Sequence, residues 1–178
     1  MVWCAVCRFP PTAKADGLPP CYRCEQLGLG HAVRQAEPYI NGSMLLLNGD
    51  NVFAGSVSQV VTAADAEDVD GVLAVEDVSR AIAKTTGVLE LDGDRVTDLV
   101  EKPNDPPSTL VTTGCYVLPE DIFHACALLR PSADGEYQLS EAVGLLVQAG
   151  YNFEIVRLGE RVNVNTLDDI ERAGRLIS

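Results

Sequence analysis

From Glu25 onward, short apolar runs alternate with amphipathic stretches along the chain. Apolar runs bounded by Gly, Asn and Asp predict buried strands, and apolar positions three or four residues apart predict helices. The predicted strands are 44–47, 71–75, 87–91, 96–100, 110–118 and 153–158. The predicted helices are 29–36, 56–65, 119–129, 140–150 and 166–177. This alternation predicts an α/β domain with one core.

The first 24 residues have a different character from the rest of the chain. They hold four of the six cysteines and four of the ten prolines, and their net charge is +2, against −15 for residues 25–178. The sequence therefore predicts two parts, an atypical Cys-rich N-terminal segment over 1–24 and a folded domain over 25–178.

The formal net charge of −13 argues against nucleic acid and anionic membrane surfaces as partners, because both attract positive potential. Only three of the thirteen cations are lysine, and such an acidic surface suits a salt-rich, halophilic-type cytoplasm where screening reduces self-repulsion. No apolar run approaches the roughly 20 residues of a membrane span. The N-terminus also lacks a signal-peptide pattern, so a cytoplasmic location is expected.

The run Leu45-Leu46-Leu47-Asn48-Gly49-Asp50 is the most useful candidate for a site. An apolar strand that ends in Gly-Asp places a carboxylate at the carboxyl edge of the sheet, where α/β proteins bind ligands. Asp50 there can hold Mg²⁺ while substrate phosphates complete the coordination shell. Taken alone, the tripeptide is better explained as an ordinary strand-to-loop turn.

The interpretation of residues 45–50 as part of a site depends on a series of motifs that surround it in a fixed order. They are Gly28-Leu29-Gly30-His31-Ala32, Thr86-Gly87-Val88, Val100-Glu101-Lys102-Pro103, Thr112-Thr113-Gly114-Cys115-Tyr116, Gly135-Glu136-Tyr137-Gln138-Leu139-Ser140-Glu141 and Asn163-Val164-Asn165-Thr166. Over residues 25–178 this series resembles the sugar-1-phosphate nucleotidyltransferases. The resemblance implies a Rossmann-like nucleotide-diphospho-sugar transferase domain with a mixed, mostly parallel sheet, here truncated at its N-terminus.

The resemblance implies a role for each matching residue on the nucleoside side. Gly28 and Leu29 match positions that contact the nucleobase, and Asn48 and Gly49 lie beside the nucleoside. Leu29 is more similar to the thymidylyltransferase version of this position than to the uridylyltransferase version.

On the sugar side, Gly87 matches a glycine whose backbone contacts the sugar, and Thr112 occupies another sugar-contact position. Glu101 matches a glutamate that accepts hydrogen bonds from sugar hydroxyls, and the adjoining Lys102 matches a catalytic lysine that faces the sugar phosphate. Without the resemblance, Glu101-Lys102-Pro103 would be a solvated strand end and Gly87 a simple strand start.

Asp50 and Asn163 match the two metal-ligand positions, so the resemblance implies Mg²⁺ as cofactor. The implied reaction transfers a nucleotidyl group from dTTP or UTP to a sugar-1-phosphate such as glucose-1-phosphate, releasing pyrophosphate, in nucleotide-sugar biosynthesis. Such catalysis relies on alignment and charge neutralisation. Family members often assemble, which leaves a homo-oligomer open.

The glycine-rich loop with Arg and Lys that grips the triphosphate in this family has no match, which predicts impaired activity. The family's first strand is also missing, so the edge of the strand before Asp50 would be unpaired unless residues 2–7 pair there instead.

The four N-terminal cysteines, Cys4, Cys7, Cys21 and Cys24, form two Cys-x₂-Cys pairs, a spacing typical of zinc sites. The segment is either a small zinc knuckle or unrelated sequence read in place of the true N-terminus, and the abrupt change in charge favours the latter. The alternative function is a non-catalytic nucleotide-sugar-binding or regulatory module, with zinc in the knuckle. Cys115 and Cys126 lie in apolar runs and are expected in the core.

Overall fold

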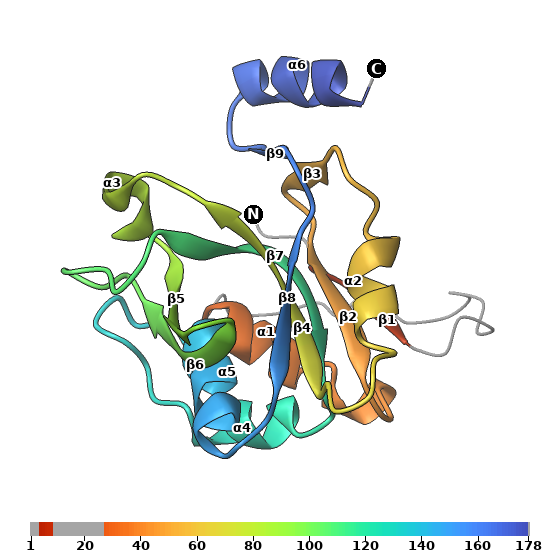
Figure 1. Ribbon diagram of the computed structural model, residues 1–178, viewed down its shortest axis with the longest axis vertical. Helices are drawn as coiled ribbons and strands as arrows, with labels where there is room; N and C mark the ends of the chain where they lie inside the picture. Colours follow the sequence, from red (N-terminus) through yellow and green to blue (C-terminus); the bar gives the residue numbers. More distant parts are fainter. Residues whose placement is uncertain (1–3, 9–26, 178) are drawn as a thin grey trace.

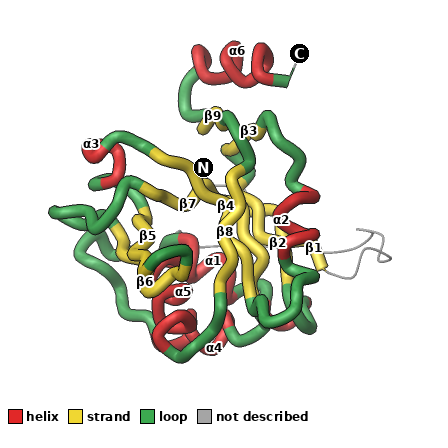
Figure 2. The backbone as a smooth tube through the Cα atoms, viewed as in Figure 1, coloured by secondary structure: helices red, strands yellow, loops and turns green. Residues whose placement is uncertain are grey.

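The computed structural model describes residues 4–8 and 27–177, and its centre is a curled sheet (Figures 1 and 2). The described strands of this sheet follow the order β1-β2-β7-β4-β8, and β5 pairs with both β6 and β7. Their bounds are β1 Cys4–Arg8, β2 Met44–Asn48, β4 Gly71–Asp77, β5 Gly87–Asp92, β6 Arg95–Glu101, β7 Leu110–Leu118 and β8 Phe153–Arg157. The expected α/β class is confirmed.

The sheet is mixed, as expected, but the expectation that it is mostly parallel is wrong. The nine-residue strand β7 lies between β2 and β4 and runs antiparallel to both. Strands of the same direction are therefore separated by β7, and β4–β8 is the sole parallel pair among the described strands of this sheet. The carboxyl ends of β2, β4 and β8 still point to the same edge.

Side chains that alternate along β4 enter two different cores, because successive strand residues point to opposite faces. Leu73 and Val75 of β4 join the larger core, while Val72 and Ala74 join the other. The larger core includes residues of three helices, α1 Leu29–Arg34, α4 Ile122–Leu128 and α5 Leu139–Gln148. Helix α2, Ser58–Ala63, covers the opposite face through the fully buried Val60.

Strand β1 pairs antiparallel with β2, from Cys4 opposite Asn48 to Arg8 opposite Met44, and takes the edge position of the sheet. This confirms that the N-terminal segment pairs with the strand before Asp50. The pairing supplies partners for the backbone groups along an otherwise open apolar edge.

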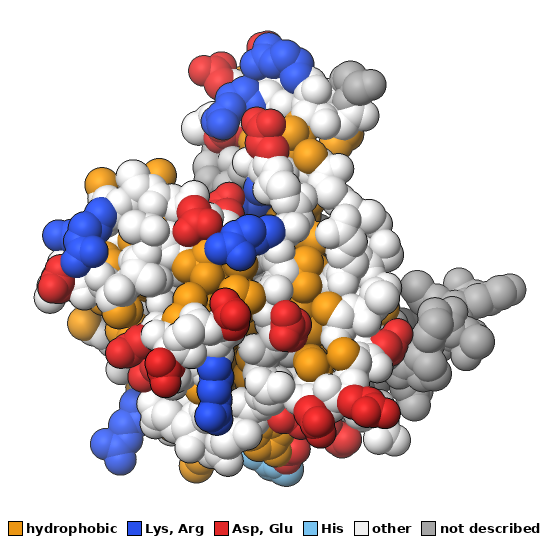
Figure 3. All heavy atoms as spheres, in the orientation of Figure 1, with side chains coloured by type: hydrophobic (Ala, Val, Ile, Leu, Met, Phe, Trp, Pro, Cys, Tyr) orange, Lys and Arg blue, Asp and Glu red, His pale blue; other side chains and the backbone are white. Residues whose placement is uncertain are grey.

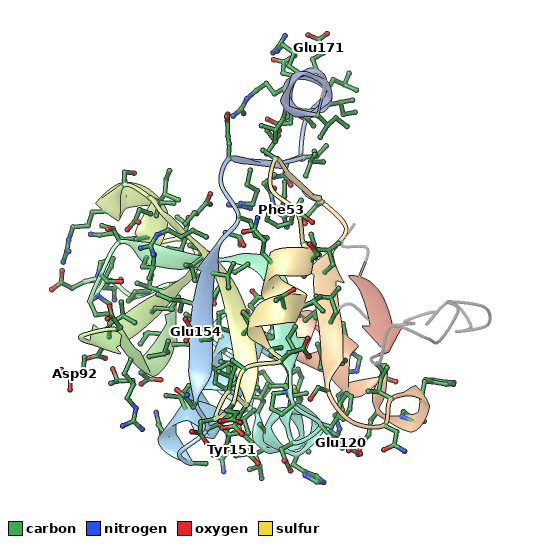
Figure 4. The ribbon with its side chains drawn as sticks, turned by 45° about the vertical axis from the view of Figure 1, so that its right-hand side comes forward. Phe53, Asp92, Glu120, Tyr151, Glu154 and Glu171 are labelled. Atoms are coloured by element: carbon green, nitrogen blue, oxygen red, sulfur yellow. The ribbon has the colours of Figure 1, made fainter. Side chains whose placement is uncertain are left out.

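Two three-residue strands, β3 Asn51–Phe53 and β9 Arg161–Asn163, form a separate antiparallel ribbon, which helix α6 Leu167–Leu176 follows. This arm projects from one end of the sheet, with Phe53 near its base and Glu171 on the helix (Figure 4). Tyr151 and Glu120 mark the opposite end. Thr166 caps α6, since its hydroxyl accepts from Asp169 N and the Asp169 carboxylate accepts from Thr166 N.

Acidic side chains are scattered over the face shown in Figure 3, which agrees with their even spread along the sequence. Within the described part of the chain, no helix is both long enough and apolar enough to span a membrane.

All six predicted strands and all five predicted helices form, with ends shifted by up to three residues. Short elements were not predicted: β3, β9, the 3₁₀ helix η1 Glu37–Tyr39 and the four-residue helix α3 Arg80–Ala83. Such short elements have too few residues for a period to show in the sequence.

Candidate functional site

A cavity of about 600 Å³ lies at the end of the sheet where β2 and β4 terminate. Six of the predicted site residues line it, namely Leu29, Asn48, Gly87, Glu101, Thr112 and Asn163. Its volume is in the range of small-molecule sites. These six residues, from Leu29 to Asn163, are thus gathered around one space, although they come from six separate elements.

The sugar end of the predicted site is compact. Gly87 begins β5 directly opposite Glu101, which ends β6. A Cβ atom added to Gly87 would lie 3.3 Å from Glu101 Oε2 and 3.5 Å from Thr112 Oγ1. The three predicted sugar contacts therefore surround the same small volume, and the lack of a side chain at position 87 keeps it open.

Glu101 is held by a partner that the sequence did not single out. Ser140, in the first turn of α5, donates from Oγ to Glu101 Oε2 at 2.6 Å. Burial raises the pKa of Glu101, and the hydrogen bond from Ser140 opposes this increase. The carboxylate is thereby oriented toward the cavity with one oxygen already hydrogen-bonded.

Lys102 lies next to this end but does not line the cavity. Its backbone has φ of 43°, in the left-handed region, and its Nζ donates to Asp134 Oδ2 at 2.7 Å. The ammonium is 4.0 Å from Glu101 Oε1. The hydrogen bond to Asp134 raises the pKa of Lys102, and the same bond holds the pKa of Asp134 well below its usual range. In this conformation the predicted phosphate-facing lysine is engaged by the loop before α5.

At the other end, the two predicted metal ligands both contact Asn51 of the β3–β9 ribbon; Asn163 lines the cavity, and Asp50 does not. Asn51 pairs with Asn163 in register, and Val164 N donates to Asp50 O at 2.7 Å. The Asn51 side chain bridges the two, donating to Asp50 Oδ1 at 2.9 Å and accepting from Asn163 Nδ2 at 3.2 Å.

A carboxylate and an amide oxygen are donors that suit a hard divalent cation, so Asp50 and Asn163 fit Mg²⁺ chemically. No group of three or more Asp, Glu, His or Cys side chains with metal-site geometry occurs within residues 27–177. A cation held by this pair would need substrate phosphates and water to complete its shell.

The nucleoside end is built on close backbone packing. Gly28 precedes α1 with φ of 92°, and a Cβ atom there would lie 2.7 Å from Tyr137 O. Gly30 N donates to the same carbonyl at 2.8 Å. This packing fixes Leu29 at the cavity wall, whereas Gly28 and Gly49 do not line it.

Asn48 lines the same cavity, and its buried Oδ1 atom has no hydrogen-bond partner among the described residues. A buried acceptor without a partner is costly, which makes it a candidate to accept from a ligand hydroxyl or N–H group.

Arg161, Glu76, Asn51 and Ser140 belong to the site but were not identified as site residues from the sequence. Ser140 stood within a motif that the sequence did highlight. Arg161 lies just before the Asn163 motif, and nothing local marks it as a cavity residue.

The predicted zinc ligands cannot all be placed. Cys4 and Cys7 lie in β1, and Cys21 and Cys24 lie outside the described residues. Zinc binding by the four cysteines stays a prediction. The expectation that Cys115 and Cys126 belong to the core is confirmed, since both are buried.

Comparison with known proteins agrees with this geometry. Residues 17–173 match the family described as nucleotidyl transferase. The chain is 37% identical over 161 residues to the UTP–glucose-1-phosphate uridylyltransferase AglF of Haloferax volcanii, which covers 88% of this chain and 66% of that protein. It is 31% identical over 127 residues to the low-salt glycan biosynthesis nucleotidyltransferase Agl11 of the same organism, covering 70% of this chain and 35% of the relative.

Among solved structures, UDP-glucose pyrophosphorylase in complex with UDP-glucose superposes with a TM-score of 0.74 at 24% identity. That match covers 85% of this chain and 62% of the other, and it supports the fold. The chain thus spans only part of the length of these proteins: 66% of AglF, 62% of the pyrophosphorylase and 35% of Agl11.

Proposed function

The chain belongs to the nucleotidyl transferase family, and from this premise we propose that it acts in nucleotidyl transfer from UTP or dTTP to a sugar-1-phosphate. The observation that carries the proposal is the single cavity that joins the Gly87–Glu101–Thr112 end to the Asn163 end. One end suits sugar hydroxyls and the other suits the cation that accompanies phosphates.

In the proposed reaction, an oxygen of the sugar-1-phosphate attacks the α-phosphorus of the nucleoside triphosphate, and pyrophosphate leaves. The chain supplies orientation: the Glu101 carboxylate accepts from sugar hydroxyls, while Ser140 keeps that carboxylate in place. Asp50 and Asn163 are the proposed Mg²⁺ ligands, and the ion would neutralise phosphate charge when bound. Lys102 would reach the sugar phosphate only after leaving Asp134.

We further propose that residues 1–178 alone turn over slowly. Residues 27–177 contain no glycine-rich loop followed by Arg and Lys, and residues 1–24 contain a single glycine. The β- and γ-phosphates therefore lack the backbone cradle that such a loop provides.

The test separates binding from turnover. Purified chain is titrated with UDP-glucose and with dTDP-glucose by calorimetry, and pyrophosphate release is followed with glucose-1-phosphate and each triphosphate. Binding of one nucleotide-sugar with little pyrophosphate release is expected. Release at rates ordinary for enzymes would contradict the proposed impairment, and failure to bind either ligand would contradict the assignment of the cavity.

A second candidate is a non-catalytic nucleotide-sugar-binding module with a zinc knuckle, favoured by the Cys-x₂-Cys pairs. It predicts about one zinc per chain by elemental analysis and no turnover under any condition. A zinc-free protein that still binds nucleotide-sugar would exclude the zinc knuckle.

The nucleobase of the substrate and the cellular location of the protein rest on features other than the cavity. Leu29 favours thymidine, whereas AglF is named for UTP, so competition between UDP-glucose and dTDP-glucose decides the base. We propose a cytoplasmic location, where nucleoside triphosphates are available.

A further inference from the structure

The cavity has few charged side chains for a site that is proposed to hold phosphates. Its charged lining residues are Glu76, Glu101 and Arg161. Among the described residues that line it, Arg161 is the sole lysine or arginine, because Lys102 lies outside and bonds to Asp134. Among the described lining residues, a phosphate bound in this cavity could therefore contact one protein cation.

The guanidinium of Arg161 is held in a fixed orientation. Its Nη2 atom donates to Glu76 Oε1 and its Nη1 atom donates to Asn51 Oδ1. The arginine side chain is only 18% exposed, and its buried Nε–H has no hydrogen-bond partner among the described residues. The guanidinium carries five N–H donors, so these two bonds leave N–H groups for a ligand.

The Arg161 guanidinium lies between the proposed metal end and the proposed sugar end of the site. Asn51, its partner on one side, also bridges the proposed metal ligands. Glu76, its partner on the other side, is in register with Val111, which precedes the proposed sugar contact Thr112. The guanidinium thus lies between the proposed metal end and the proposed sugar end of the cavity.

We propose that Arg161 binds the sugar-linked phosphate, with Glu76 and Asn51 as positioning residues for its guanidinium. This inference rests on the proposed function and names the group that receives the phosphate. The rigid, planar fork of arginine matches two phosphate oxygens, and Glu76 offsets the cost of holding the cation in a largely buried position.

The test measures the affinity for UDP and for uridine, which differ by the phosphates, together with the affinity for UDP-glucose. Ligand-observed NMR detects the weak binders, and calorimetry measures the tighter one. The variants are Arg161→Gln, Arg161→Lys and the double variant Glu76→Gln/Arg161→Gln, which avoids an unpaired Glu76. The matched control is Arg157→Gln, which removes an exposed Arg–Asp pair with Asp77 on the neighbouring strand.

Arg161→Gln and the double variant are expected to weaken UDP and UDP-glucose binding by about 10- to 100-fold, with uridine affinity unchanged. Arg161→Lys is expected to recover part of the loss, because it keeps the charge but not the fork. Equal affinities in wild type and the double variant would overturn the inference and leave the proposed function standing. So would an equal loss for uridine. A wild type that binds none of the three ligands would overturn the proposed function, and this inference with it.

Discussion

Ser140 donates a 2.6 Å hydrogen bond to Glu101, although the two residues lie 39 positions apart in the chain. The bond ties the first turn of α5 to the end of β6, at the point where Gly87 leaves space beside both side chains. A half-exposed carboxylate would find its partners in water. Here burial raises the pKa of Glu101, and the hydrogen bond from the Ser140 hydroxyl offsets part of the cost of burying the charged carboxylate.

Replacing the carboxylate by an amide, Glu101→Gln, is expected to change the pH dependence of stability. Because the pKa of Glu101 is raised in the folded state, its contribution to stability is present below its unfolded pKa and is lost as pH rises through the folded value. The variant should therefore have the higher free energy of unfolding at pH 7, with the difference vanishing below about pH 4. Urea unfolding across this pH range measures the effect.

The matched control is Glu154→Gln, which changes an exposed carboxylate on β8. It should show neither the gain at neutral pH nor the convergence at acidic pH. In the binding assay, Glu101→Gln should also weaken UDP-glucose binding, since an amide offers one oxygen acceptor instead of two. A variant with lower stability than wild type at pH 7 would contradict the burial argument.

Gly87→Ala is expected to affect binding more than folding. The added methyl group would lie 3.3 Å from Glu101 Oε2 and from Ser140 Cβ, which is the space assigned to the sugar. Loss of glycine flexibility stabilises a strand by about 0.5–1 kcal/mol, which offsets the crowding. UDP-glucose affinity should fall while the unfolding midpoint changes little. Gly174→Ala in α6, where a Cβ atom meets open space, is the control that should leave binding intact.

Asp50→Ala is expected to remove the effect of Mg²⁺ on ligand binding. In wild type, UDP-glucose should bind at least about tenfold more tightly with Mg²⁺ than with a chelator, because the cation links Asp50 to the phosphates. Asn163→Ala should reduce the Mg²⁺ effect less, since it removes a neutral ligand. Asp65→Ala, at an exposed carboxylate after α2, is the control. Equal Mg²⁺ dependence in Asp50→Ala and wild type would contradict the assignment of Asp50.

The two core cysteines are expected to resist thiol reagents in the folded state. Burial raises the pKa of Cys115 to about 11 and that of Cys126 to about 12. At pH 8 roughly one Cys115 thiol in a thousand would be ionised, and the thiolate is the reactive form. A variant with serine at positions 4, 7, 21 and 24 isolates these two thiols. Native labelling as fast as labelling in denaturant would show that they are accessible.

The long elements of the fold could be predicted because their apolar periods extend over enough residues. Strand β7 has the predicted bounds, and α5 starts within one residue of the predicted position. Strand directions could not be predicted in this way, because an apolar run reads the same whether its neighbour is parallel or antiparallel. That is why the expectation of a mostly parallel sheet failed.

The site residues divide in the same way, into those that could be predicted from the sequence and those that could not. Motifs carried by long strands placed Gly87, Glu101 and Thr112 at the cavity. Arg161 was missed because its meaning depends on Glu76 and Asn51, which lie 85 and 110 positions away. It lies on a three-residue strand that has no periodic signal of its own.

The acidic surface predicts a stability that rises with salt. At a net charge of −13, carboxylates repel one another across the folded surface, and raising KCl from about 0.1 to 1 M shortens the screening length from about 10 to 3 Å. The free energy of unfolding should therefore increase over this range. Asp92→Asn/Asp94→Asn, at exposed positions in the β5–β6 turn, removes two negative charges and should reduce the gain. An identical salt dependence in this variant would indicate that salt acts through burial of apolar surface and not through screening.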